Sequence, residues 1–215
     1  MLTLYGNLES GNVYKVRLLW SWLGIPHRRV EVNQVRGEPM SAPFRAINPI
    51  GKVPSVRLED GRLLSESGAI LFWFARGTRY LPDDPWIQTS VLRWMFFEQY
   101  SHEPAIAVNR YLLRFAERLT DFDRERVRLN DGRGRHALQV MEDHLAGHDW
   151  LAGDGPTIAD IALHAYTHVA PEGGFSLDPF PATRRWLARI AALPNHIALM
   201  QETSALPVER LVQAA

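Results

Sequence analysis

The stretch NPIGKVPSVRLEDGRLLSESGAI, residues 48–70, predicts a β-hairpin that runs directly into a helix. Two short apolar segments, residues 56–58 and 63–64, flank the pair Asp60-Gly61. An Asp-Gly pair between two apolar runs is a strong signal for a tight antiparallel turn. After Glu66-Ser67 the chain is apolar as far as Ala75, which predicts a helix that is buried on most of its sides.

The residues before this stretch predict a β-α-β unit. Residues 2–5 alternate in polarity like a strand, and the apolar residues between Asn12 and Leu23 recur at helical spacing until Gly24. Val30 and Val32 alternate with polar residues and predict a second strand parallel to the first. Together with the hairpin and its helix, these segments predict a compact α/β domain over residues 1–79, built on a four-stranded mixed sheet.

The rest of the chain has mostly helical periodicity. A proline-containing linker at residues 80–85 precedes an expected all-helical domain over residues 86–215, so the fold class is α+β with two domains. Pro104 should kink or split the first long helix of that domain. Thr157 and Asp160 have the spacing of a capping box at a helix start. Further helices are expected over residues 121–145 and 182–192, with a short one after Pro194.

The composition excludes several classes of function. The chain has 215 residues and no cysteine, which excludes disulfides, thiolate metal sites and a cysteine nucleophile. Its eight histidines include pairs at helical spacing, but no pair belongs to an H-E-x-x-H motif, so no metal is expected. No apolar run is long enough to span a bilayer, and the first residues do not resemble a signal peptide. We therefore expect a cytoplasmic protein that does not bind membranes.

The formal net charge of zero conceals an uneven distribution. Residues 1–80 contain eleven Lys or Arg residues and six acidic ones, whereas residues 81–215 contain thirteen and eighteen. A modest basic excess in the first half suits a small anionic ligand. A nucleic-acid binder needs a much denser basic patch, so no nucleic acid is expected.

Three short segments of the first domain are candidates for a ligand site. Ser10 lies between the first strand and the first helix, Lys52-Val-Pro54 precedes the third strand, and Glu66-Ser67 begins the buried helix. All three should lie on one side of the sheet, and the unpaired amides of a helix N-terminus favour a bound carboxylate. Taken alone, Ser10 is also explained as an N-cap and Glu66-Ser67 as a simple helix start.

The motifs together resemble one known family. The combination Ser10-x-Asn12, Asn48-Pro-Ile-Gly-Lys-Val-Pro54, Ser65-Glu-Ser-Gly-Ala-Ile70 and Thr157-Ile-Ala-Asp160 is similar to the cytosolic glutathione S-transferases over the whole chain. This resemblance implies a thioredoxin-like N-terminal domain followed by an all-helical domain. The members most similar in these motifs are the bacterial and theta-like ones that use Ser, Thr or Cys at the end of the first strand.

The resemblance implies how the sulfur of glutathione would be activated. Ser10 matches the serine that donates a hydrogen bond to the sulfur and so favours the thiolate. Asn12, slightly further along the helix, is a candidate second donor. The phenol of Tyr5 is an alternative to both.

The resemblance also assigns the remainder of the glutathione site. Pro54 matches the family's cis-proline, and Val53 would pair its backbone with the cysteinyl part of glutathione. Glu66 and Ser67 match the pair that holds the γ-glutamyl end. Lys52 would face the glycyl carboxylate, and Gln34 is a weaker candidate there.

The resemblance therefore implies a homodimeric glutathione transferase that acts in detoxification. The helical domain should line the pocket for a hydrophobic electrophile, with Tyr100 and Arg110 as candidate contacts. Glutathione would be a co-substrate, and no metal is implied. Two alternatives stay open: a glutathione-dependent disulfide or peroxide reductase, and a non-catalytic binding module with the same fold.

Overall fold

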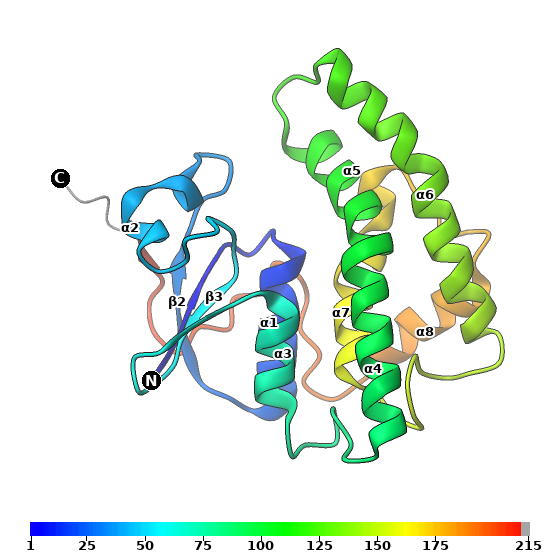
Figure 1. Cartoon of the computed structure of the whole chain (residues 1–215), viewed down its shortest axis with the longest axis horizontal. Coiled ribbons are helices and arrows are strands. Elements are labelled where there is room, and N and C mark those ends of the chain that lie inside the picture. Colours follow the sequence, from blue (N-terminus) through cyan, green and yellow to red (C-terminus); the bar gives the residue numbers. More distant parts are fainter. Residues whose placement is uncertain (212–215) are drawn as a thin grey trace. The chain divides into compact units, whose positions relative to one another are not determined.

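A computed structural model describes residues 1–211, and its elements fall into two compact units (Figure 1). The first unit has the predicted order of strands and helices, starting with a β-α-β arrangement and ending with a hairpin and a helix. Its elements up to residue 75 are β1 (Leu2–Tyr5), α1 (Gly11–Leu23), β2 (His27–Glu31), η1 (Glu38–Met40), α2 (Ala42–Arg45), β3 (Ser55–Arg57), β4 (Leu63–Ser65) and α3 (Ser67–Ala75).

The sheet of this unit has the strand order β4-β3-β1-β2-β5. Strand β1 is parallel to β2 and antiparallel to β3, and β3 pairs with β4 through the predicted Asp60-Gly61 hairpin. The prediction of a mixed, thioredoxin-like sheet is confirmed, but over residues 1–211 the sheet has five strands and not the four predicted. The additional strand, β5 (Glu209–Arg210), adds to the edge of β2 in parallel.

The core of the first unit lies between the sheet and its helices. Leu4 of β1, Trp20 of α1, Val56 of β3 and Ile70 of α3 are fully buried in one cluster. Apolar side chains on both strands and helices therefore contribute to a single core, and burial of this area is the main force that holds the sheet and helices together.

The second unit is all-helical, as predicted. Helix α4 packs against α7, and α5 packs against α6 and η3. The elements are α4 (Pro85–Phe97), η2 (Glu98–His102), α5 (Glu103–Phe115), α6 (Asp121–Leu145), α7 (Ile158–Thr167), η3 (Ala170–Gly173) and α8 (Pro181–Ala191).

Pro104 interrupts the α-helical hydrogen bonding, as expected, directly after a π-helical turn. The helix changes to a π-helical turn over Glu98–His102, and the N–H of Glu103 donates to the carbonyl of Glu98. Pro104, at the start of α5, has no N–H with which to continue the α-helical ladder. The chain stays helical from Pro85 to Phe115, so the helix is not split, and the interruption takes the form of a π-turn directly before the proline.

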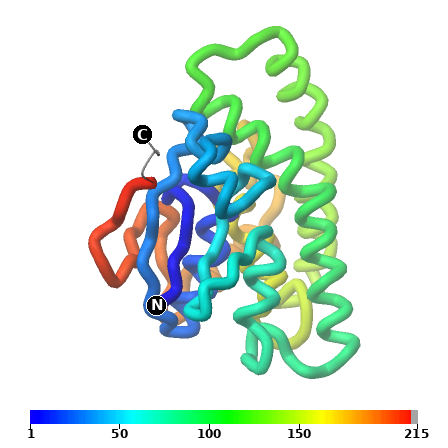
Figure 2. Tube along the Cα trace, turned by 60° about the vertical axis from the view of Figure 1, so that its left-hand side comes forward, coloured from blue at the N-terminus to red at the C-terminus, as the bar shows by residue number. Residues whose placement is uncertain are grey.

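The structure divides the chain differently from the predicted domains 1–79 and 86–215. The first unit contains Met1–Phe74 and also the chain from Pro194 onward, whereas the second is Ala75–Leu193. The short helix expected after Pro194 is absent from the described residues, which instead form turns and strand β5. Figure 2 shows this C-terminal segment, residues 194–211, beside the first strands of the chain.

Helix α1 holds the C-terminal segment through side chains that reach its backbone carbonyls. Tyr14 donates to the carbonyl of Ile197 at 2.7 Å, and Arg17 donates to that of Leu199 at 2.8 Å. Arg17 is completely buried, and this burial lowers the pKa of its guanidinium to about 10. These contacts explain why the last part of the chain belongs to the first unit.

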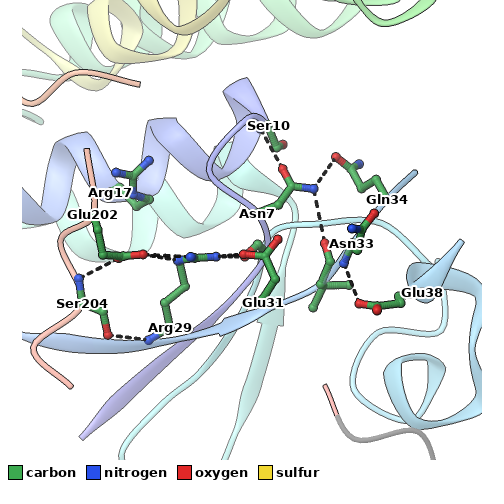
Figure 3. A network of polar contacts seen from close by, with 12 residues as sticks. Asn7, Ser10, Arg17, Arg29, Glu31, Asn33, Gln34, Glu38, Glu202 and Ser204 are labelled. Atoms are coloured by element: carbon green, nitrogen blue, oxygen red, sulfur yellow. Dashed lines mark hydrogen bonds and ion pairs between the residues drawn. The ribbon is translucent and has the colours of Figure 1, made fainter. Parts of the chain in front are cut away.

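Arg29 of β2 connects the C-terminal segment to the loop after β1 (Figure 3). Its buried guanidinium donates to Glu202 at 2.8 and 3.0 Å, pairs with Glu31, and donates to the carbonyl of Gly6 at 2.7 Å. Burial alone would raise the pKa of Glu202, but the hydrogen bonds and charge of Arg29 outweigh it and hold this pKa below its usual value.

We expect Glu202→Gln to reduce stability at neutral pH by about 1–2 kcal/mol, because a charge-assisted hydrogen bond is lost from a partly exposed pair. The pKa of Glu202 is lowered on folding, so its contribution is complete above the unfolded value near 4.5 and is lost as the pH falls further. Urea unfolding at pH 7 and pH 3 checks this. A difference between wild type and variant that stays the same at both pH values would contradict it.

Candidate functional site

Ser10 is placed by its role as the N-cap of α1. Its backbone is extended (φ −75°, ψ 119°), and its hydroxyl oxygen accepts from the N–H of Val13 at 3.4 Å. The backbone carbonyl of Ser10 accepts from Tyr14 at 2.9 Å. Because the oxygen acts as the acceptor in the cap, the hydroxyl hydrogen remains to be donated to a ligand at the positive end of the helix.

Asn12 and Ser67 lie in direct contact although they are distant in the sequence. The side-chain oxygen of Asn12 accepts from the hydroxyl of Ser67 at 3.2 Å and from the ammonium of Lys15 at 2.7 Å. Ser67 is the first residue of α3, so this contact brings the N-terminal ends of α1 and α3 together. Two helix ends that meet create a region of positive potential suited to anionic groups.

Glu66 adopts an unusual backbone conformation directly before α3. It is exposed and has a φ of 67°, the left-handed region that residues other than glycine rarely occupy. Its carbonyl accepts the first helical hydrogen bond, from Ile70 at 2.9 Å. Backbone strain of this kind often occurs at ligand sites, where it fixes a side chain in one direction.

The peptide bond between Val53 and Pro54 is cis, which confirms the conformation predicted for this proline. Both residues are buried where the chain enters β3. The side chain of Lys52 is exposed, and its carbonyl accepts from Asn48 at 2.7 Å. This loop therefore presents a cation to solvent on a rigidly hydrogen-bonded backbone.

The phenol of Tyr5 lies within the core cluster and is 6% exposed. Its oxygen accepts from the guanidinium of Arg57 at 3.2 Å. Arg57 is opposite Thr3 in the sheet register. Thr3 precedes Tyr5 by two residues along β1, so Arg57 lies on the side of Tyr5 away from Ser10. The phenol is thus engaged toward the other end of the strand from Ser10.

Gln34 is linked to this region by a residue that sequence reasoning missed. The side-chain amide of Asn7 donates to the Gln34 side-chain oxygen at 3.1 Å, and its oxygen accepts from the N–H of Ser10 at 2.9 Å (Figure 3). The detectable signal was an asparagine three residues before an N-cap, a spacing at which Asn caps a local turn.

Tyr100 and Arg110 both belong to the helical unit but differ in environment. Tyr100 is 87% exposed on the π-helical turn. The guanidinium of Arg110 is buried and donates to Glu172 at 2.8 Å, and Arg114 pairs with the same carboxylate at 3.2 Å. The structure leaves the phenol of Tyr100 open to solvent and places Arg110 in an ion-pair network inside its own unit.

The imidazole rings are stacked in both histidine pairs. Their centroids are 4.2 Å apart in His144/His148 and 4.6 Å apart in His164/His168. In each pair the second ring contacts the backbone carbonyl of the first residue, at 2.9 and 2.7 Å. Across residues 1–211 no group of three or more His, Cys, Asp or Glu side chains is arranged to hold a metal ion. Over the same residues, no helix combines the length and apolar character needed to cross a membrane.

The first unit thus brings together a serine hydroxyl, two helix N-termini and a strained glutamate. This arrangement can receive a ligand that carries both carboxylates and an ammonium, and it can stabilise a developing anion next to Ser10.

Comparison with known proteins is consistent with this geometry. Residues 10–76 match the family described as glutathione S-transferase, N-terminal domain, and residues 98–194 match glutathione S-transferase, C-terminal domain. The structure resembles that of glutathione S-transferase from Pseudomonas fluorescens Pf-5, with a TM-score of 0.90, 44% identity and coverage of 93% of this chain and 99% of that one.

Two other similar proteins have different descriptions. The disulfide-bond oxidoreductase YfcG of Escherichia coli K12 is 26% identical, over 90% of this chain and 92% of its own length. The structure of Ure2p in complex with glutathione has a TM-score of 0.81 and 26% identity, covering 90% of this chain and 95% of that one.

Proposed function

Because the chain belongs to the glutathione S-transferase family, we propose that it binds glutathione on its first unit and activates the thiol for attack on a small electrophile. The observation that carries this proposal is the position of Ser10, whose hydroxyl hydrogen can be donated at the N-terminus of α1. The contact between Asn12 and Ser67 supports it by joining α1 to α3 at the same end.

Ser10 acts in this mechanism by favouring the thiolate of glutathione. A free thiol has a pKa of about 8.5, and each unit by which it is lowered corresponds to about 1.4 kcal/mol. A hydrogen bond donated by the Ser10 hydroxyl, together with the positive N-terminal end of α1, stabilises the thiolate of glutathione and not its neutral thiol. The thiolate then attacks an electrophilic carbon, a C–S bond forms, and the leaving group departs with its electron pair.

The other proposed contacts hold the rest of glutathione. Glu66 faces the γ-glutamyl ammonium. Ser67 binds the adjacent carboxylate through its backbone N–H and through its hydroxyl, which exchanges its hydrogen bond to Asn12 for one to the ligand. Val53 pairs with the cysteinyl backbone beside Pro54. Lys52 and Gln34 bind the glycyl carboxylate, and Lys52 does so through its exposed ammonium group. We propose that the chain is of the theta-like serine type, because a serine stands at position 10.

The electrophile is proposed to be hydrophobic, and Tyr100 is the better supported of its two candidate contacts because its side chain is exposed. Arg110 already has Glu172 as a partner, so a role for Arg110 requires that it act through this ion pair. We further propose a cytoplasmic homodimer that detoxifies such compounds.

A reductase is the second candidate, favoured by the similarity to the disulfide-bond oxidoreductase YfcG. The same site supports it, because the nucleophile is the sulfur of glutathione in either reaction. Rates with an aryl halide, a disulfide and a hydroperoxide distinguish the two. Turnover of the aryl halide alone supports a transferase, and turnover of the other two supports a reductase. Retention on immobilised glutathione without any turnover would identify a non-catalytic binding module.

We expect Glu66→Ala and Ser67→Ala each to weaken glutathione binding by about 10- to 100-fold, because each removes a hydrogen bond to a charged group of the ligand. Calorimetric titration of glutathione checks this. Glu59→Ala is the control, since Glu59 is exposed in the turn of the hairpin before α3 and pairs with the N-terminus. Wild-type affinity in both variants would show that the γ-glutamyl site has been misplaced.

A further inference from the structure

The loop between β1 and α1 is anchored to β2 independently of Asn7. The N–H of Gly6 donates to the carbonyl of Val30 at 3.0 Å, and the guanidinium of Arg29 donates to the carbonyl of Gly6 at 2.7 Å. A side chain at Gly6 would clash with Val13, since a Cβ there would lie 2.4 Å from its methyl group. The beginning of the loop is therefore held by its backbone and by packing against α1.

Asn7 adds side-chain contacts to this anchored loop. Its side-chain oxygen accepts from the N–H of Ser10 at 2.9 Å. Its side-chain amide donates to the carbonyl of Val32 at 3.2 Å and to the side-chain oxygen of Gln34 at 3.1 Å. One half-buried side chain thus joins the proposed sulfur donor to the chain that follows β2, as Figure 3 shows.

These contacts determine what Ser10 and Gln34 present to a ligand. With its N–H bonded to Asn7 and its carbonyl bonded to Tyr14, Ser10 has both backbone groups paired, and only the hydroxyl hydrogen is left to donate. The side-chain oxygen of Gln34 accepts from Asn7, so the N–H₂ group of the same amide points away from Asn7. This N–H₂ group is a donor suited to a carboxylate.

We propose that Asn7 is a positioning residue, which orients the Ser10 hydroxyl toward the sulfur of glutathione and turns the Gln34 amide toward the carboxylate at the other end of the ligand. This inference rests on the proposed function. Asn7 itself touches neither reacting atom, so its effect on the thiol must pass through Ser10. A purely structural residue would instead change stability without changing the thiol pKa of bound glutathione.

The test measures the ultraviolet absorbance of the glutathione thiolate bound to the protein as a function of pH. We expect Asn7→Ala to raise the pKa of the bound thiol by about 1, which is a tenfold decrease in the ratio of thiolate to thiol at a given pH. Asn7→Ser restores an oxygen that can accept from Ser10 N–H and should recover most of this shift. Asn33→Ala is the matched control, because Asn33 caps the N–H of Arg36 in the neighbouring loop and does not contact Ser10.

A double-mutant cycle with Ser10→Ala completes the test. If Asn7 acts through Ser10, adding Asn7→Ala to Ser10→Ala leaves the thiol pKa unchanged. An equal shift in both backgrounds, or a wild-type thiol pKa in folded Asn7→Ala, overturns the inference. If Asn7→Ala does not fold, Asn7→Ser decides: a thiol pKa as high as in Ser10→Ala overturns the inference, and recovery supports it. A wild-type protein that does not lower the thiol pKa would instead contradict the proposed function.

Discussion

Ser10→Ala is expected to reduce turnover by about 10- to 100-fold while glutathione affinity stays nearly unchanged. The lost hydrogen bond to an anion is worth about 1.5–3 kcal/mol, and each 1.4 kcal/mol is about a factor of ten in rate. The contact contributes little to binding of the neutral thiol. Its loss should therefore raise the pKa of the bound thiol and lower turnover, and change affinity little. Steady-state rates and the thiolate absorbance of bound glutathione measure both effects.

Ser41→Ala is the matched control for this experiment. Ser41 caps α2 as Ser10 caps α1, and its hydroxyl oxygen accepts from the N–H of Phe44 at the same 3.4 Å. Each variant loses a cap worth about 1 kcal/mol, but only Ser10→Ala should lose turnover. Full activity in Ser10→Ala would transfer the role of sulfur donor to Asn12 or Tyr5.

Asp160→Ala is expected to destabilise the helical unit by about 3–5 kcal/mol, a large part of the 5–15 kcal/mol typical of a domain. The Asp160 carboxylate is fully buried and accepts from Leu151 N–H at 3.0 Å and the indole of Trp186 at 2.9 Å. It also accepts from both the N–H and the hydroxyl of Thr157, at 2.8 and 3.0 Å. Burial raises the pKa of this carboxyl, and these donors oppose the rise.

The second capping box of the chain is the control. Asp123 accepts from the N–H and the hydroxyl of Thr120 with the same local geometry as Asp160 and Thr157, but on the surface at the start of α6. Water replaces the lost partner there, so Asp123→Ala should have only a small effect. Urea unfolding compares the two variants. Equal losses of stability would show that the cap, and not the buried network around Trp186, accounts for the role of Asp160.

Features encoded by neighbouring residues could be predicted from the sequence. The Asp60-Gly61 hairpin, helix α6 and the capping box of Thr157 and Asp160 all follow from contacts between residues a few positions apart. Ser10 was identified in the same way, because an N-cap forms hydrogen bonds only with the first turn of its own helix. Local geometry is sufficient for all of these, and no distant partner has to be identified.

The contacts that complete the candidate site could not be predicted in this way. Asn7 bonds to Val32 and Gln34, which are 25 and 27 residues away, and Asn12 bonds to Ser67, which is 55 residues away. Asn, Gln and Ser side chains are common on surfaces, and their types alone do not identify a distant partner. Only the register of β1 beside β2, and the packing of α3 beside α1, bring these particular groups within hydrogen-bonding distance.

The C-terminal segment shows the same limit most clearly. From Pro194 onward the sequence pattern indicated a further helix, yet Glu202 pairs with Arg29, 173 residues earlier, and β5 extends the sheet. By itself, the sequence determined the α/β and helical segments and their caps, because short-range hydrogen bonds and periodic burial encode them. The tertiary structure alone decided the fifth strand and the polar contacts around Ser10, because these depend on long-range packing that brings buried charges and amides together.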